Sequence, residues 1–357
     1  MKLVFLDETQ IGAVLAKTIY GPDGSVLLTK GIALNNKYIS RLKDFGIESA
    51  YVINEKIQQF NLSLEVDEPI SDTVRQETIK IVKENLVKII NDSSLNYTQI
   101  AEAVNQIIDE LLSKDLLIFN LTDIRSFDNY TFAHSVNVAI LAIAVGINLK
   151  LSKKELKILG IGAFLHDIGK IKIPIQILNK PGKLDDEEYR IIQQHPEYGF
   201  DFIRKNKNFN IISAHIAYQH HEKFDGSGYP QGLKGEEIHQ LARITSIADV
   251  YDALTSNRPY RKAYLPHKAL EFILGGSATF FDPDIIKVFL KCISPYPVGT
   301  IVHLNTGEVG VVLKQNQEAL LRPVILIYEK EGKELAEPIE KNLIDFPTIL
   351  VKDIITD

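Results

Sequence analysis

The pattern of apolar and polar positions divides the chain into three stretches. Up to about Asn54, short apolar runs alternate with the turn segments YGPDGS and LTKG, which predicts small strands and one short helix near residues 37–45. From about Ile70 to Cys292, apolar residues recur at helical spacing and almost nothing alternates as a strand would. After SPYPVG, the β-rich runs TIVHLN, VGVVLK and RPVILIYE predict a small barrel that ends near Phe346.

Helix start signals support the helical reading of the middle stretch. Ser152 with Glu155, and Asp185 with Glu188, have the spacing at which a cap side chain and a later carboxylate each bind the other residue's free amide. Between positions 70 and 112, apolar residues form stripes at helical spacing. Stripes of this kind often pack on one another in signalling proteins, so a homodimer through these helices is one alternative.

The predicted fold is therefore multidomain. Its centre is an all-α domain, with a small N-terminal α+β module on one side and a small C-terminal module resembling a β-barrel on the other. The expected boundaries are residues 1–65 for the N-terminal module, 66–126 for a helical connecting segment, 127–293 for the central domain and 294–357 for the C-terminal module. The length of 357 residues agrees with this division, because single cores rarely grow beyond about 250–300 residues.

Composition narrows the setting. The net charge of −6 offers no general attraction for a nucleic acid polymer or an anionic membrane. The single cysteine, Cys292, excludes an intrachain disulfide and a zinc–thiolate cluster. Acidic residues at positions 7 and 8 interrupt the apolar core that a signal peptide would need, and the longest apolar run, Val136 to Ile147, is shorter than the ~20 residues of a membrane span. We therefore expect a cytoplasmic protein without membrane insertion.

The candidate chemistry lies in the helical stretch. In QHHEKFDGSGYP, His220 and His221 are adjacent, and adjacent side chains on a helix diverge by about 100°, so both cannot fill one core position. FLHDIGK adds His166 and Asp167. The same region also contains the histidines and the acidic residue His134, His195 and Asp249. Imidazole and carboxylate without thiolate suit iron, manganese or zinc.

Each of these residues has a simpler interpretation when taken alone. His134 lies on a strongly apolar segment, where a histidine is more often a hydrogen-bonded core residue. His195 precedes a proline and could simply end a helix, and Asp249 could pair with a nearby base. The remaining histidines are assigned structural roles: His215, His239, His267 and His303.

Taken together, the motifs resemble a known family. DNYTFAHSVNVA, FLHDIGKIKIP, QQHPEYGF, HHEKFDGSGYPQGLKGEEI, ARITSIADVYDALTSNRPYRKA and FDPDIIKVF occur in the order seen in the HD superfamily of metal-dependent phosphohydrolases, and specifically in its HD-GYP branch of cyclic di-GMP phosphodiesterases. The resemblance covers roughly residues 127–289. It implies an HD-type helical fold for the central domain.

The resemblance also implies a metal centre. One metal would be held by His134, His166, Asp167 and Asp249, and the environment of a second by His195, His220 and His221, with Asp167 bridging. Some family members hold a third metal and carry a glutamate four positions before the first histidine, where this chain has Tyr130. Because a tyrosine is a poor ligand beside better donors, we expect a binuclear centre. The resemblance suggests iron, with manganese as the alternative.

Substrate contacts follow from charge and spacing. Lys170 comes three positions after Asp167, so on a helical turn it reaches the same side and is expected to act in catalysis by neutralising a phosphate oxygen. Arg258 and Arg261 are expected to face a diester with two phosphates, with surface ion pairing as the alternative. Four residues of the loop are expected to shape the wall of the substrate cleft, although the loop could also be a plain surface turn: Gly226, Gly228, Tyr229 and Pro230.

The expected function is hydrolysis of cyclic di-GMP to pGpG, GMP or both. Two alternatives stand beside it. One is a receptor that binds the dinucleotide without turnover and signals through the flanking modules. The other is an HD phosphohydrolase for another nucleotide, such as cyclic GMP-AMP. The complete ligand set favours an enzyme, because a degenerate receptor would be expected to lose at least one ligand.

Overall fold

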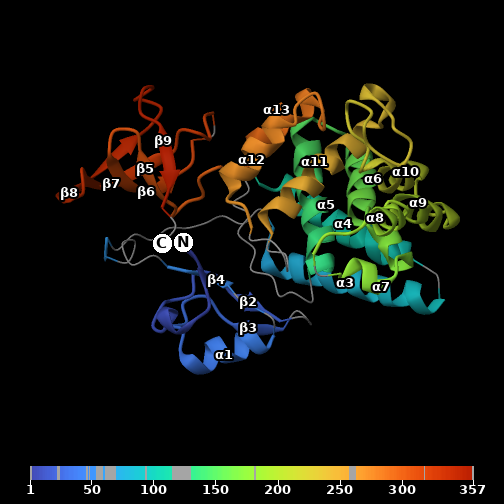
Figure 1. Ribbon diagram of the computed structural model, residues 1–357, viewed down its shortest axis with the longest axis horizontal. Helices are drawn as coiled ribbons and strands as arrows, with labels where there is room; N and C mark the ends of the chain where they lie inside the picture. Colours follow the sequence, from blue (N-terminus) through green and yellow to red (C-terminus); the bar gives the residue numbers. More distant parts are fainter. Residues whose placement is uncertain are drawn as a thin grey trace. The chain divides into compact units, whose positions relative to one another are not determined.

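The computed structural model describes residues 2–21, 25–45, 47, 49–53, 59–60, 70–92, 95–114, 130–180, 182–256, 263–316 and 318–355 (Figure 1). The chain forms two compact units. A helical unit comprises residues 69–117 and 129–292, and the second unit comprises residues 1–68, 118–128 and 293–357.

The described part of the helical unit contains α-helices and short 3₁₀ turns. In chain order these are α3 (Asp72–Asp92), α4 (Tyr97–Leu112), α5 (Tyr130–Asn148), α6 (Lys153–Phe164), η3 (Ile168–Lys172), α7 (Ile175–Leu178), α8 (Asp186–Ile192), α9 (His195–Lys205), α10 (Ile211–Gln219), η4 (Gly235–Glu237), α11 (Gln240–Thr255), α12 (Pro266–Gly275) and α13 (Pro283–Cys292). The start signals predicted at Ser152 and Asp185 are confirmed, since both residues form reciprocal caps with the glutamate three positions later.

Helix α5 is the central helix of this unit. Its residues from Val138 to Val145 are at most 1% exposed, and it packs against α3, α4, α6, α11 and α13. A helix that is apolar on every side is buried in a protein core or in a membrane. No helix within the described ranges is both long enough and apolar enough to cross a membrane.

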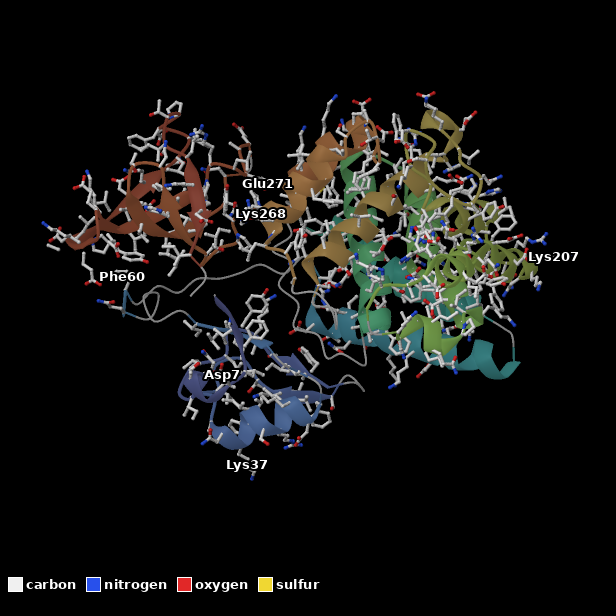
Figure 2. All side chains as sticks on the ribbon, in the orientation of Figure 1. Asp7, Lys37, Phe60, Lys207, Lys268 and Glu271 are labelled. Atoms are coloured by element: carbon white, nitrogen blue, oxygen red, sulfur yellow. The ribbon has the colours of Figure 1, made fainter. Side chains whose placement is uncertain are left out.

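The apolar stripe of α4 is buried inside the chain. Ile100, Val104 and Ile107 are fully buried, and α4 packs against α6. Close approach depends on Gly160, where an added Cβ would lie 2.6 Å from Val104 Cγ1. The stripe of α4 is therefore not available for the dimer contact considered from the sequence. At the surface, side chains pair locally, as Lys268 and Glu271 do on α12 (Figure 2).

The second unit contains two kinds of sheet. Near the N-terminus, β1 (Lys2–Phe5) pairs with β4 (Ser49–Val52) and β2 (Ile19–Tyr20) pairs with β3 (Val26–Leu28), both antiparallel. The turn η1 (Glu8–Gln10) and helix α1 (Asn36–Asp44) accompany them. Leu15, Leu34 and Leu42 form the centre of an apolar core there.

The C-terminal part is a five-stranded antiparallel sheet. Its strands β5 (Ile301–Leu304), β6 (Glu308–Lys314), β7 (Val324–Lys330), β8 (Lys333–Asn342) and β9 (Val351–Ile354) lie in the order β8-β7-β6-β5-β9. Within the described residues β8 and β9 are the two edges and do not pair, so the barrel-like closure expected from the sequence is not confirmed. The Arg322 guanidinium instead donates hydrogen bonds to backbone carbonyls of residues 343–349. These bonds hold the segment that connects β8 to β9.

Candidate metal centre

Seven side chains from separate parts of the helical unit meet at one place. The structure brings together all the ligands expected from the sequence: His134 on α5, His166 and Asp167 between α6 and η3, His195 at the start of α9, His220 and His221 after α10, and Asp249 on α11. Their possible ligand atoms form three overlapping groups, within each of which all atoms lie within 4.8 Å of one another. The histidines left with structural roles are not in these groups; His215, for instance, packs against Phe200.

Three of the histidines are oriented by the same local device. The Nδ1 of His166, His195 and His220 each lies close to the backbone carbonyl three residues earlier. These carbonyls belong, in the same order, to Ala163, Ile192 and Ala217, at 2.7, 2.7 and 2.8 Å. A carbonyl only accepts, so Nδ1 must carry the proton and Nε2 keeps its lone pair. This tautomer is the one that binds a metal through Nε2.

Asp167 connects the two halves of the cluster. Its Oδ2 lies 3.4 Å from His166 Nε2 and 3.8 Å from His134 Nε2, and its Oδ1 lies 3.3 Å from His195 Nε2 and 3.8 Å from His220 Nε2. Among the described residues, Asp167 Oδ1 and His166 Nε2 are buried without a hydrogen-bond partner. Unsatisfied buried polar atoms are costly, and a cation between them would satisfy both. The residues therefore fit a metal ion.

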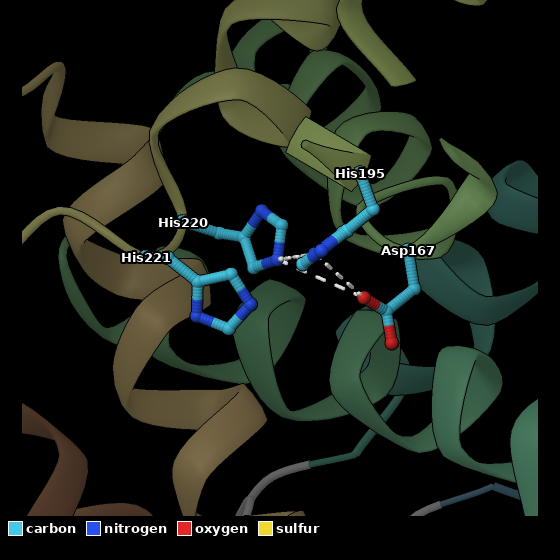
Figure 3. Close-up of side chains that lie close together, drawn as sticks. All are labelled: Asp167, His195, His220 and His221. Atoms are coloured by element: carbon cyan, nitrogen blue, oxygen red, sulfur yellow. Dashed lines mark hydrogen bonds and ion pairs between the residues drawn. The ribbon is translucent and has the colours of Figure 1, made fainter. Parts of the chain in front are cut away.

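The adjacent histidines both reach the cluster because the helix ends at the first of them. Helix α10 stops at Gln219, and His220 is its C-cap. The His220 and His221 ring centroids lie 4.1 Å apart, and the His221 ring also lies 4.9 Å from that of His195. Figure 3 shows the rings of His220 and His221 facing the side chains of His195 and Asp167, which come from the opposite side of the same space.

The proposed ligands differ in the direction in which burial and neighbouring charges shift their pKa values. Burial and the neighbouring imidazoles hold the pKa of His220 well below its usual value, and burial is also the main reason that the pKa of His221 falls to about 3. Burial acts against charge on Asp167 too, yet Lys170 and His166 hold its pKa well below the usual range. For His134, burial opposes protonation, but Asp249 and Asp252 raise its pKa to about 9. A metal ion that binds at His134 would therefore displace a proton.

Sequence reasoning missed the residues that support His134. Its Nδ1 lies 2.7 Å from Oδ2 of Asp252, a buried carboxylate, and Asn137 Nδ2 donates to Asp252 Oδ1 at 3.0 Å. The available signal was spacing: Asn137 follows His134 by three positions on α5, and Asp252 follows Asp249 by three on α11. Residues three apart share a helix face, so Asn137 and Asp252 each lie on a helix face that also carries a proposed ligand.

The glycine-rich loop is anchored beside the cluster by Glu222, another residue that sequence reasoning missed. The buried carboxylate of Glu222 accepts hydrogen bonds from the backbone N–H groups of Gln231 and Leu233, at 2.7 and 3.0 Å. The Tyr229 ring stacks on His221 with ring centroids 4.8 Å apart. Gly226 has a φ of 86°, which favours glycine. At Gly228 an added Cβ would lie 2.3 Å from Lys223 N. Pro230 is exposed and joined to Tyr229 by a cis peptide bond.

Of the basic residues expected to contact substrate, the structure describes only Lys170. Lys170 Nζ lies 2.5 Å from Asp167 Oδ2, so its ammonium pairs with the shared carboxylate rather than pointing away from the cluster. Arg258 and Arg261 lie outside the described residues. The side chain of Tyr130, on which the expectation of a binuclear centre depended, is also outside what the structure describes.

Comparison with known proteins gives two family matches. A family model described as an HD domain matches residues 105–285, and one described as a KOW domain associated with an HD domain matches residues 301–356. One solved structure, described as Bd1817, an HDG"Y"P protein from Bdellovibrio bacteriovorus, aligns with a TM-score of 0.50 at 17% identity, over 80% of this chain and 98% of that one. At this identity the alignment speaks for the fold alone.

The chain matches part of the length of several curated relatives. The cyclic di-GMP phosphodiesterase PA4108 of Pseudomonas aeruginosa is 34% identical over 74% of this chain and 64% of its own. The cyclic di-GMP phosphodiesterase response regulator RpfG of Xanthomonas campestris is 41% identical over 46% and 44% of the two chains. The 3'3'-cGAMP-specific phosphodiesterase 2 of Vibrio cholerae is 35% identical over 53% and 37%. The chain thus spans less than two thirds of the length of each.

Proposed function

Because this chain belongs to the HD domain family, we propose that it is a metal-dependent phosphodiesterase that hydrolyses cyclic di-GMP to pGpG, GMP or both. The family resemblance indicated by the sequence motifs is confirmed by the family match and by the relatives named as cyclic di-GMP phosphodiesterases. The activity of this chain is our proposal.

One observation carries it. Two of the three overlapping groups of imidazole and carboxylate atoms share Asp167, and none of the three contains a thiolate, which suits ions that activate water and stabilise phosphoryl oxygens. We assign His134, His166, Asp167 and Asp249 to one ion, and His195, His220 and His221, with Asp167 bridging, to a second. The proposed centre is binuclear, with iron as the first candidate and manganese as the second.

In this proposal, a lysine, the glycine-rich loop and two arginines bind and orient the substrate. Lys170, 34% exposed at its side chain, is near enough to the cluster to share its ammonium between Asp167 and a phosphate oxygen. The loop from Gly226 to Pro230, with Tyr229 against His221, forms a wall of the substrate site. Arg258 and Arg261 are assigned to the second phosphate on the basis of their charge and sequence position.

The proposal is tested by metal content and turnover in one sample. We expect about two equivalents of metal in anaerobically purified protein, hydrolysis of cyclic di-GMP, and loss of both in His166→Ala and Asp167→Ala. His215→Ala is the matched control, because it removes a histidine of the same unit that lies outside the ligand groups. Full metal content in Asp167→Ala would contradict the assignment. Lys170→Ala and Arg258→Ala should retain metal and weaken substrate handling.

A second candidate substrate has its own support. One relative is named as specific for 3'3'-cGAMP, so a hybrid cyclic dinucleotide belongs in the assay beside cyclic di-GMP. Faster turnover of the hybrid would reassign the substrate and keep the reaction. Tight dinucleotide binding without turnover under any metal or redox condition would support a receptor instead.

The identity of the metal is tested by the effect of oxygen on activity. A histidine and carboxylate centre that holds ferrous iron should lose activity in air and regain it on reduction, whereas a manganese centre should be largely insensitive. Counting iron and manganese in the assayed sample assigns the result. Oxygen-insensitive turnover by an iron-loaded sample would reject the redox expectation and leave the phosphodiesterase proposal standing.

A further inference from the structure

A buried chain of hydrogen bonds leads from the connecting helix α3 to the proposed ligand His134. Arg75 Nη1 donates to Asn137 Oδ1 at 2.7 Å, Asn137 Nδ2 donates to Asp252 Oδ1 at 3.0 Å, and Asp252 Oδ2 lies 2.7 Å from His134 Nδ1. All four residues are at most 6% exposed. Arg75 lies ahead of the motifs that carried the resemblance.

The direction of each bond is fixed by chemistry. A guanidinium has only donors, so the Asn137 amide must present its oxygen to Arg75. Its NH₂ group then faces Asp252 and donates to one carboxylate oxygen. The other carboxylate oxygen accepts the Nδ1 proton of His134, which leaves the Nε2 lone pair for a metal. Without Arg75, only Asp252 would remain to hold the Asn137 amide in this orientation.

The same geometry separates His134 from the other histidines. His166, His195 and His220 are held by the carbonyl three residues earlier in their own chain segment. His134 is held instead by side chains from α5 and α11 that connect to α3. Its orientation therefore depends on tertiary packing, whereas that of the other three is local.

We propose that Arg75 is a positioning residue which, through Asn137 and Asp252, holds His134 in the orientation and tautomer that bind metal. This inference rests on the proposed metal centre. It connects α3 to that centre through side chains of α5 and α11, so that a displacement of α3 away from α5 weakens metal binding at His134.

The test is a titration of the full-length, metal-stripped protein with Co²⁺ under anaerobic conditions, followed by its visible absorption. Removal of a residue that orients a ligand typically costs about 10–100-fold in metal affinity, so Asp252→Asn should weaken one bound equivalent within that range. Arg75→Met should weaken the same equivalent by about 10-fold, the lower end of the range. Arg75→Gln is the second variant, should Arg75→Met fail to fold.

A double-mutant cycle separates transmission from general damage to α3. If Arg75 acts through Asp252, the variant with both changes should bind Co²⁺ no more weakly than Asp252→Asn alone, because one pathway is removed twice. Val82→Ala is the matched control, since Val82 is a buried residue of α3 outside the hydrogen-bond chain. It should destabilise the helix and leave the Co²⁺ affinity unchanged.

The outcomes distinguish the inference from the proposed function. Wild-type affinity in both Arg75 variants, additive losses in the double variant, or an equal loss in Val82→Ala would each overturn the role of Arg75. A wild-type protein that binds no Co²⁺ would remove the proposed metal centre and the inference with it. Because the readout is metal binding, absence of turnover toward cyclic di-GMP does not affect the test.

Discussion

Gly169→Ala is expected to remove metal by moving two ligand-bearing segments apart. Gly169 lies in η3, two residues after Asp167, and packs against the first turns of α9. An ideal Cβ at this position would lie 1.9 Å from the carbonyl oxygen of His195 and 2.5 Å from Gly199 N. Both contacts are with backbone, so no side-chain rotation relieves them.

The size of the displacement follows from these distances. A carbon and a carbonyl oxygen approach to about 3.3 Å at closest, so η3 and α9 must separate by roughly 1.4 Å at this point. Asp167 Oδ1 and His195 Nε2 are now 3.3 Å apart, and ligand positions in a metal site are defined to about ±0.2 Å. We therefore expect an affinity loss of about 100-fold for the ion that these two residues would share.

Overpacking also costs stability, about 1–3 kcal/mol. For a unit of this size that corresponds to a fall in Tm of about 2–12 °C. The assay is bound metal by elemental analysis together with Tm by calorimetry on the same metal-loaded sample. Gly275→Ala is the control, because a Cβ there meets nothing within 4 Å. Wild-type metal content and affinity in Gly169→Ala would refute this reasoning.

Three further predictions concern other parts of the chain. Gly228→Ala, whose Cβ would lie 2.3 Å from Lys223 N, should shift the loop and lower kcat/KM about 100-fold while metal content stays at the wild-type level; loss of metal would show that the loop supports the ligands. Burial raises the pKa of the Cys292 thiol to about 12, so at pH 8 a thiol reagent should label it only as the protein unfolds; fast labelling of folded protein would contradict its burial. Although burial opposes ionisation of Glu308, the hydrogen bond from Lys341 lowers its pKa, so the pair stabilises above the unfolded pKa of about 4.3 and loses its effect as pH falls through the lower folded value. The stability difference between wild type and Lys341→Met, about 1 kcal/mol at neutral pH, should therefore vanish at low pH in denaturant titrations, and a constant difference would reject the ion pair as its source.

The sequence was enough to predict features that depend only on residues close together in the chain, such as helix starts. The caps at Ser152 and Asp185 depend on residues three positions away, and the sequence identified both. Helical periodicity likewise placed the long stretch between positions 70 and 292 in helices. The same locality orients His166, His195 and His220, because each donates to a carbonyl within its own turn.

The tertiary structure decided what depends on contacts between distant segments. Periodicity left open whether the stripe of α4 packs in the chain or on a second copy, and packing against α6 buries it within the chain. Strand-like runs could not say whether the C-terminal sheet closes, since closure depends on whether its edge strands pair. The family resemblance, and not spacing, grouped the ligands in advance. The roles of Asp252 and Arg75 could not be predicted from the sequence, because each resembles an ordinary charged helix residue. Only the packing of α3, α5 and α11 buries both beside Asn137.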